Sequence, residues 1–91
     1  MVVELPFKER QIDYNCFIRR FSPDTDPMEF VWHRDREDRI IDVIEPGGWK
    51  FQFEDQLPIT LEKYTRLEIP AGTYHRVIPG PKELKIFLQK L

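Results

Sequence analysis

Eight prolines and four glycines divide this chain of 91 residues into short pieces, and none of them carries an apolar repeat of 3.6 residues long enough for a sizeable helix. Alternating apolar and polar side chains, which are typical of half-buried strands, recur instead. The clearest alternation runs from Trp49 to Glu54, with three aromatic residues on one face, directly after the turn Pro46-Gly47-Gly48. The sequence therefore predicts an all-β fold.

Further strands are predicted wherever β-forming residues run between turns, such as the turn expected from Ser22 to Pro27. These strands are Ile12 to Phe21, Glu29 to Asp35, Arg39 to Glu45, two short strands within Pro58 to Leu67 with a turn near Glu62-Lys63-Tyr64, and Leu84 to Gln89. The apolar face of each strand is expected to point inward. One core should therefore contain Ile41, Val43, Trp49, Phe51, Phe53, Leu67, Ile69 and Ile86.

The chain length favours one small domain, residues 1–91, near the lower end of what can bury a self-sufficient core. Hydrophobic residues at 41% and charged residues at 33% are typical of a soluble globular protein. Apolar residues lie on both faces of several strands, so the outer set needs a cover. The sequence therefore predicts a homodimer that covers Phe30, Ile40, Ile44 and Phe87.

The charge pattern and the single cysteine exclude several classes of function. The 14 basic and 16 acidic side chains give a net charge of -2 without a basic stripe, which argues against a nucleic-acid partner. No stretch resembles a membrane span, and residues 1–6 lack the pattern of a signal peptide, so a cytoplasmic protein without a membrane partner is expected. Cys16 cannot form an internal disulfide, and we expect a buried structural thiol there.

Two histidines mark the predicted functional site. His33 lies in the densest run of charge in the chain, between apolar segments, and His75 ends the ordered stretch 69–75. His33 and Asp35 point to one face of their predicted strand, and Arg39 lies on the same side as the core residues of its own strand. These four residues are expected to meet in one pocket. Two kinds of pocket fit these residues. One binds a metal ion, and the other has no metal and holds Asp35 and Arg39 as a buried ion pair.

The stretch from Ile69 to His75 resembles the second motif of the cupin superfamily, in which proline, any residue, glycine and two further residues precede a histidine. Pro70, Gly72 and His75 match these positions. With its short strands and aromatic inner faces, the chain is similar to small single-domain, RmlC-like cupins over most of its length. The resemblance implies a double-stranded β-helix, or jelly-roll barrel, with His75 pointing inside.

The first cupin motif has two histidines separated by one residue, then a glutamate and a glycine at the hairpin. The corresponding positions here are His33, Asp35 and Arg39. A carboxylate can still bind a metal, whereas a guanidinium cannot. Glu37 is a further candidate if its loop folds back. The resemblance therefore implies a divalent ion of zinc, iron, nickel or manganese on His33, Asp35, Glu37 and His75, or a barrel that has lost its metal.

Three functions remain open at this point. The first is a metal-binding cupin, including an enzyme of the isomerase or dioxygenase kind. The second is a metal-free pocket that binds a small polar molecule through Arg39, Tyr74 and the histidines. Arg76 joins this set if it forms an anion-binding rim with Arg34 and Arg36, which otherwise are plain surface arginines. The third is a structural module that self-associates, and the sequence does not choose between an enzyme and a binding protein.

Overall fold

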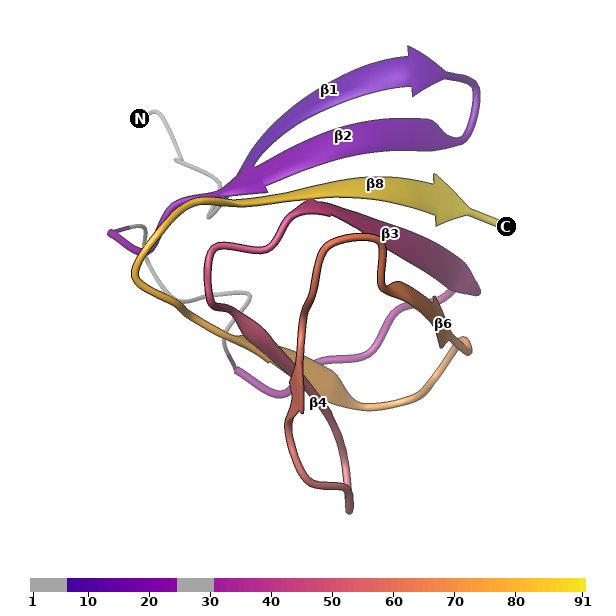
Figure 1. Ribbon diagram of the computed structural model, residues 1–91. Helices are drawn as coiled ribbons and strands as arrows, with labels where there is room; N and C mark the ends of the chain where they lie inside the picture. Colours follow the sequence, from indigo (N-terminus) through magenta and orange to yellow (C-terminus); the bar gives the residue numbers. More distant parts are fainter. Residues whose placement is uncertain (1–6, 25–30) are drawn as a thin grey trace, which may run out of the picture.

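The computed structural model describes residues 7–24 and 31–91, which form eight β-strands in two antiparallel sheets (Figure 1). The strands are β1 (Phe7–Asp13), β2 (Cys16–Phe21), β3 (Arg39–Glu45), β4 (Lys50–Phe53), β5 (Ile59–Thr60), β6 (Arg66–Ile69), β7 (His75–Ile78) and β8 (Leu84–Lys90). Neither range contains a helix, and so neither contains a helix long and apolar enough to cross a membrane. The all-β prediction is confirmed.

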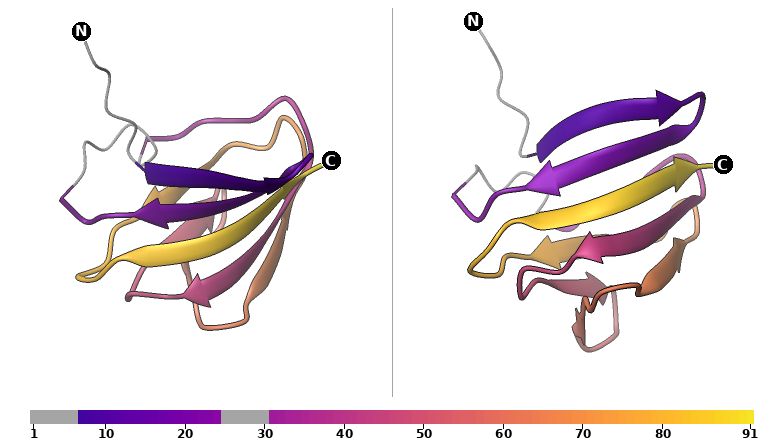
Figure 2. Two further views of the ribbon diagram at one scale, coloured as in Figure 1. Left: turned by 90° about the horizontal axis from the view of Figure 1, so that it is seen from above. Right: turned by 45° about the horizontal axis from the view of Figure 1, so that its top comes forward.

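The two sheets face each other and enclose the core (Figure 2). The larger sheet has the strand order β1-β2-β8-β3-β6, and the smaller has the order β5-β4-β7. Alternate side chains point inward from both layers, and Ile41 and Leu88 of the larger sheet are buried together with Phe51 and Val77 of the smaller one. This arrangement is the two-sheet jelly-roll barrel that the resemblance implied.

The predicted core is confirmed. Ile41, Val43, Trp49, Phe51, Ile69 and Ile86 are buried, and Phe53 and Leu67 are half-buried and pack against them. The structure adds five residues that the prediction did not name, Phe21, Leu61, Val77, Leu84 and Leu88. Strand alternation identified the inner faces, whereas Leu61 lies between β5 and β6 and had no such pattern to identify it.

The turn before β4 fixes the position of the core tryptophan. Gly47 has a φ of 59°, and a Cβ at this position would lie 2.4 Å from the carbonyl oxygen of Glu83. Only glycine therefore allows the turn to pack against the loop before β8. Trp49 follows with no exposed surface, and its indole Nε1 donates a hydrogen bond to the carbonyl of Lys82.

The first predicted strand was wrong in its extent. Ile12 to Phe21 is not continuous, because the chain turns at Tyr14 and Asn15 between β1 and β2. The amide of Tyr14 donates to the side chain of Asp13 at 2.7 Å, a local bond that favours a turn. β-forming composition on both sides concealed this turn. Cys16, at the start of β2, is half-buried and not fully buried as expected.

The second predicted strand, Glu29 to Asp35, was also wrong over the residues that the structure describes. Glu29 and Phe30 lie outside the described residues, as do positions 25–27 of the predicted turn. From Val31 onward the chain makes one isolated antiparallel bridge, His33 to His75, in place of a regular strand. The later predictions were better. Arg39–Glu45 is β3, and Pro58 to Leu67 holds β5 and the start of β6 around a turn at residues 63–64.

Candidate metal centre

His75 is placed by the turn that precedes β7. Gly72 has a φ of 77°, and a Cβ there would meet no atom within 4 Å, so glycine is needed for the backbone angle and not for space. The amide of Thr73 donates to the carbonyl of Pro70 at 3.2 Å and closes the turn. β7 then begins at His75, whose side chain points inward and is only 3% exposed.

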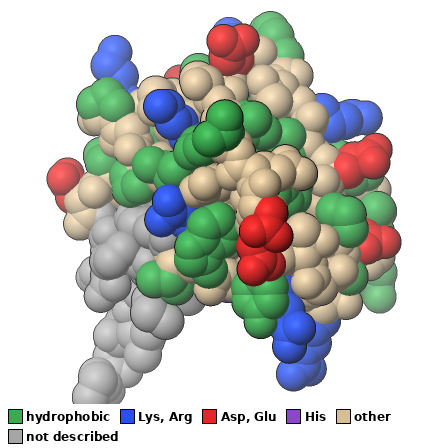
Figure 3. Space-filling model, turned by 90° about the horizontal axis from the view of Figure 1, so that it is seen from below, with side chains coloured by type: hydrophobic (Ala, Val, Ile, Leu, Met, Phe, Trp, Pro, Cys, Tyr) green, Lys and Arg blue, Asp and Glu red, His purple; other side chains and the backbone are tan. Residues whose placement is uncertain are grey.

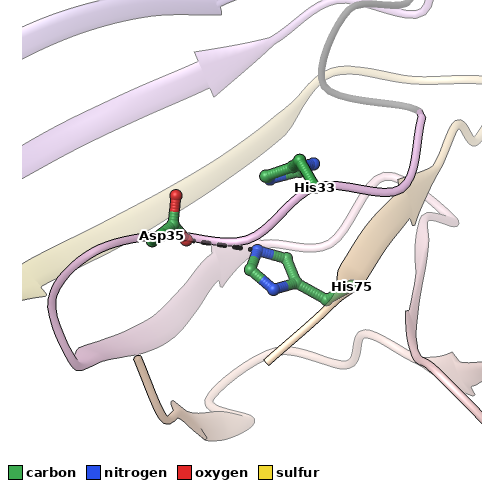
Figure 4. A group of neighbouring side chains, drawn as sticks. All are labelled: His33, Asp35 and His75. Atoms are coloured by element: carbon green, nitrogen blue, oxygen red, sulfur yellow. Dashed lines mark ion pairs between the residues drawn. The ribbon is translucent and has the colours of Figure 1, made fainter. Parts of the chain in front are cut away.

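A backbone bridge holds His33 beside His75 (Figure 4). Each residue donates its amide N–H to the carbonyl of the other, at 3.0 and 2.9 Å. The centroids of the two imidazole rings are 4.4 Å apart. The amide of Gly72 also donates to the carbonyl of Asp35 at 2.9 Å, which ties the segment after His33 to the turn before His75. The structure thus brings together the two histidines, as expected from the strand face of His33 and from the inward-pointing histidine that the cupin motif implies for position 75.

Both imidazole rings are oriented by backbone carbonyls. His33 Nδ1 lies 2.9 Å from the carbonyl oxygen of Val31, and His75 Nδ1 lies 2.8 Å from that of Thr73. A carbonyl can only accept a hydrogen bond, so each Nδ1 carries the proton. In the neutral rings the lone pair is then on Nε2. Histidines that bind metals are typically oriented in this way through their other ring nitrogen.

Asp35 supplies a carboxylate to the same place. Its Oδ2 lies 3.3 Å from His75 Nε2, yet this oxygen is buried and accepts no hydrogen bond from the described residues. The distance is that of an ion pair, but neutral His75 has no proton on Nε2 to donate. Two lone pairs therefore face each other. A cation between them would remove this repulsion and satisfy the buried oxygen.

The pKa of His75 is lowered from its ordinary value, chiefly because burial disfavours the imidazolium. Electrostatic repulsion from the imidazole of His33 and the guanidinium of Arg39 lowers this pKa further, whereas the carbonyl of Thr73 and the carboxylate of Asp35 oppose it. Burial is the largest of these causes, so the ring is neutral near pH 7. A neutral imidazole is the form that binds metals.

The lowered pKa of His75 predicts an acid-sensitive stability for the metal-free protein. The unfolded chain takes up a proton near the ordinary value of 6.5, whereas the folded protein resists it. The free energy of unfolding should therefore fall as the pH drops below about 6.5 and level off below the lowered pKa. Urea denaturation of the wild type and of His75→Gln between about pH 8 and 5 measures this difference. Equal pH dependence in the two proteins would contradict it.

His33, Asp35 and His75 together form a cluster of possible metal ligands. One ligand atom from each residue can be chosen so that all three lie within 4.8 Å of one another. Two imidazole nitrogens and one carboxylate oxygen suit zinc, iron, nickel and manganese. The donor set and the buried oxygen without a hydrogen bond therefore fit a divalent ion.

Glu37 lies outside this cluster, against Arg39. Its Oε1 accepts a hydrogen bond from Arg39 Nε at 2.9 Å and forms an ion pair with Nη2 at 2.8 Å. The bond to Arg39 is the main reason that the pKa of Glu37 is lowered. Arg39 Nη2 also lies 3.3 Å from Asp35 Oδ1, which is the oxygen other than the one facing His75. Arg39 thus holds Asp35 by one oxygen and leaves the second for the cluster.

Tyr74 and Arg76 lie beside the bridge on its outer side, because neighbours of an inward-pointing residue point outward. The guanidinium of Arg76 lies 4.8 Å from the ring centroid of Trp32, and that of Arg34 lies 5.2 Å from the ring of Tyr74. These cation–π contacts occupy both arginines on the surface. Arg36 is exposed and is not part of the cluster of His33, Asp35 and His75. The structure therefore does not bring these residues into the pocket with His33 and His75.

The cluster lies on the wall of a small, partly open cavity of about 40 Å³. Its lining is largely apolar, and its polar lining residues are His33, Asp35, His75, Arg39 and Arg19. Sequence reasoning missed Arg19. The available signal was its place between Phe17 and Phe21 on one face of the predicted strand, which is the inner face of β2. A charged residue flanked in this way is unusual, because arginine is rarely buried without a partner.

The fold and the histidine that follows a proline-glycine turn define this chain as a cupin-type barrel. No family model and no curated protein matches the sequence. Solved structures do match, and we describe three. A cupin-2 domain containing protein from Shewanella frigidimarina is 27% identical, with a TM-score of 0.67, and the match covers 94% of this chain and 81% of that one.

The other two structures share the fold at lower identity. A chain from the DMSP lyases RdDddP and RnDddQII is 16% identical with a TM-score of 0.69, and the match covers 82% of this chain and 36% of that one. The FeII form of HppE is 11% identical with a TM-score of 0.67, and the match covers 84% of this chain and 41% of that one. This chain therefore spans less than half of either protein. The cupin fold that the sequence resembled is confirmed.

Proposed function

We propose that this protein binds one divalent metal ion through His33 Nε2, His75 Nε2 and a carboxylate oxygen of Asp35. The observation that carries this proposal is Asp35 Oδ2, a buried oxygen that faces the deprotonated nitrogen of His75 at 3.3 Å without a hydrogen bond from the described residues. Such an oxygen is costly to bury unless something positive binds it. The iron in the FeII form of HppE, which shares the fold, supports a metal in such a barrel.

The bound ion would supply a Lewis acid for small molecules inside the barrel. The residues of this chain would hold and orient it. The carbonyls of Val31 and Thr73 fix the two rings, and Arg39 fixes the carboxylate of Asp35. The cavity of about 40 Å³ has room for a few water molecules or one small functional group, and not for a whole sugar. Any substrate would therefore insert only a small part of itself.

A metal-free pocket is the second candidate, and Arg39 is the observation that favours it. Its guanidinium lies 3.3 Å from Asp35 Oδ1 and partly neutralises the carboxylate, which weakens the attraction for a cation. In this alternative the histidines and Arg39 hold a small polar ligand or water. The two candidates share the same pocket and differ in whether an ion joins the three ligand atoms.

Elemental analysis of protein purified without a histidine tag separates the two candidates. We expect about one equivalent of zinc, iron, nickel or manganese per chain after addition of the metal and removal of the excess. Titration of metal-free protein with each ion then gives the preferred metal. Substoichiometric binding of all four ions, with no loss on replacing His33, would leave the metal-free pocket as the function.

We also propose that the protein is a homodimer, with the outer face of the larger sheet in its interface. Ile40, Ile44 and Phe87 are half-buried, and strand alternation places them opposite the core residues. Phe30, the fourth residue of the predicted set, lies outside the described residues. Figure 3 shows that hydrophobic side chains also gather on the face seen from below, between scattered charged ones.

The dimer should appear as twice the chain mass in light scattering at tens of micromolar protein. Phe87→Lys should shift this mass towards the monomer, because a charge in an apolar interface costs several times the thermal energy unless it is paired. Tyr64→Lys is the control, since Tyr64 is 80% exposed and lies in a turn. A monomeric wild type at this concentration would remove the proposal.

A further inference from the structure

Arg19 is a nearly buried arginine, and most of its hydrogen-bond donors have no acceptor among the described residues. Its side chain is 9% exposed and lines the same cavity as the metal-ligand cluster. Its Nε donates to Glu9 Oε1 at 2.9 Å, and its guanidinium lies 4.1 Å from the ring centroid of Phe7. Across residues 7–24 and 31–91 this is its only hydrogen bond. The terminal nitrogens, which hold four of the five guanidinium protons, are left for another acceptor.

The fold directs Arg19 into the barrel. On β2 it pairs with Glu9 of β1 and Ile86 of β8, and Ile86 is a core residue on the inner face. The next residue, Arg20, is exposed on the outer face of the same strand. An apolar residue at position 19 would pack at least as well, since buried ion pairs are seldom more stabilising than apolar contacts of the same size. Stability alone does not account for the arginine.

The charges around the cavity leave a place for one anion once a metal is bound. Among the described side chains, Glu9 balances Arg19, and Glu37 balances Arg39. Asp35 then offsets one of the two charges of a divalent ion, and one positive charge remains. An unbalanced charge is costly in an apolar cavity, so a ligand with a single negative charge is favoured.

From these observations we infer that the cavity binds a carboxylate group beside the metal, with Arg19 and Arg39 as its guanidinium partners. The inference rests on the proposed metal binding and names the class of ligand for that site. A carboxylate matches the planar guanidinium fork and carries one charge. It also fits a cavity of about 40 Å³, whereas the remainder of a larger acid would stay at the mouth. Asp35 and Arg39, at 12% and 16% side-chain exposure, mark that mouth.

The test uses protein loaded with Co²⁺, whose content is measured by elemental analysis before each titration. Sodium acetate is added at constant ionic strength, and binding is followed by the visible absorption of Co²⁺. We expect saturable binding of acetate and none of acetamide, which has the same shape without the charge. Arg19→Gln and Arg39→Gln should each weaken acetate binding at least tenfold. The affinity of Arg19→Gln for Co²⁺ should be equal or higher, because a nearby positive charge has been removed. In Arg39→Gln this gain is opposed by the loss of the group that holds Asp35, so acetate binding is compared at equal Co²⁺ content.

Arg20→Gln is the matched control, since Arg20 is the neighbouring arginine on the outer face of β2 and should bind acetate as the wild type does. Thermal unfolding shows whether each variant is folded, and Arg39→Gln, at the partly exposed mouth, decides the matter if Arg19→Gln does not fold. Failure of the wild type to bind Co²⁺ would overturn the proposed function and this inference with it. Normal Co²⁺ content with no acetate binding, or with equal binding in both variants, would overturn this inference alone.

Discussion

Replacing His75 with alanine is expected to reduce the affinity for a divalent metal by more than about a hundredfold, which exceeds the usual loss when only a supporting residue is removed. His75 contributes one of three clustered ligands, and its ring is also the group that faces the buried Asp35 Oδ2. The variant loses the nitrogen and opens the cavity to water, so the remaining ligands bind a hydrated ion weakly. Isothermal titration with Zn²⁺ and Mn²⁺ measures the change.

The neighbouring residue offers a matched control for this prediction. Tyr74→Ala removes a larger side chain next to His75, but Tyr74 lies on the outer side of the bridge and contacts Arg34. Its metal affinity should stay within about threefold of the wild type, the usual spread for a residue away from a site. His33→Ala should behave like His75→Ala. Full metal affinity in both histidine variants would show that the ion binds elsewhere.

The strands and the core could be predicted because the physics that determines them is local. Alternation along Arg39 to Glu45 and Trp49 to Glu54 identifies the inner face without knowledge of neighbouring strands. The turn before His75 is local as well, since Gly72 needs its φ of 77° whatever surrounds it. These elements matched the structure closely for this reason.

The parts that could not be predicted depend on residues distant in the sequence. The described part of the predicted strand, from Val31 to Asp35, has the alternation of a strand but forms a single β-bridge, in which His33 pairs with the backbone of His75, 42 positions later. Glu37 is a metal ligand or an ion-pair partner depending on where Arg39 points, and its sequence neighbours do not decide this. Arg19 shares a strand face with Phe17 and Phe21, but only the pairing of β2 with β1 and β8 shows that this face points into the barrel.

Asp35 shows how such distant contacts determine chemistry. Its two oxygens have different partners, with Oδ1 near Arg39 and Oδ2 near His75, each at 3.3 Å. An arginine on the first oxygen holds the carboxylate in place without covering the second. The same contact that weakens the site for a cation therefore also orients its carboxylate. The balance between these effects decides how tightly a metal binds, and removing Arg39 tests both at once.

The second large effect is expected from the replacement of Phe51, which packs against the ring of His75. Phe51 is 2% exposed, and its ring stacks on that of His75 with centroids 5.4 Å apart and an angle of 18°. Replacing Phe51 with alanine should lower the free energy of unfolding by about 3 to 5 kcal/mol, through lost burial and the cavity left behind. This is a large part of the total stability of a small domain. Urea denaturation of metal-free protein measures it.

Two further variants serve as controls for Phe51→Ala, one at an exposed apolar residue and one that keeps most of the side-chain volume at position 51. Leu57→Ala removes an apolar side chain that is 86% exposed and should cost less than about 0.5 kcal/mol. Phe51→Leu keeps most of the volume and should lose clearly less stability than Phe51→Ala, while also removing the ring that stacks on His75. If Phe51 only fills space, Phe51→Leu keeps its metal affinity. If the stacked ring also orients His75, that affinity falls although most of the stability remains. A loss under about 1 kcal/mol in Phe51→Ala would mean that β4 does not face the core, because no buried phenylalanine is removed so cheaply.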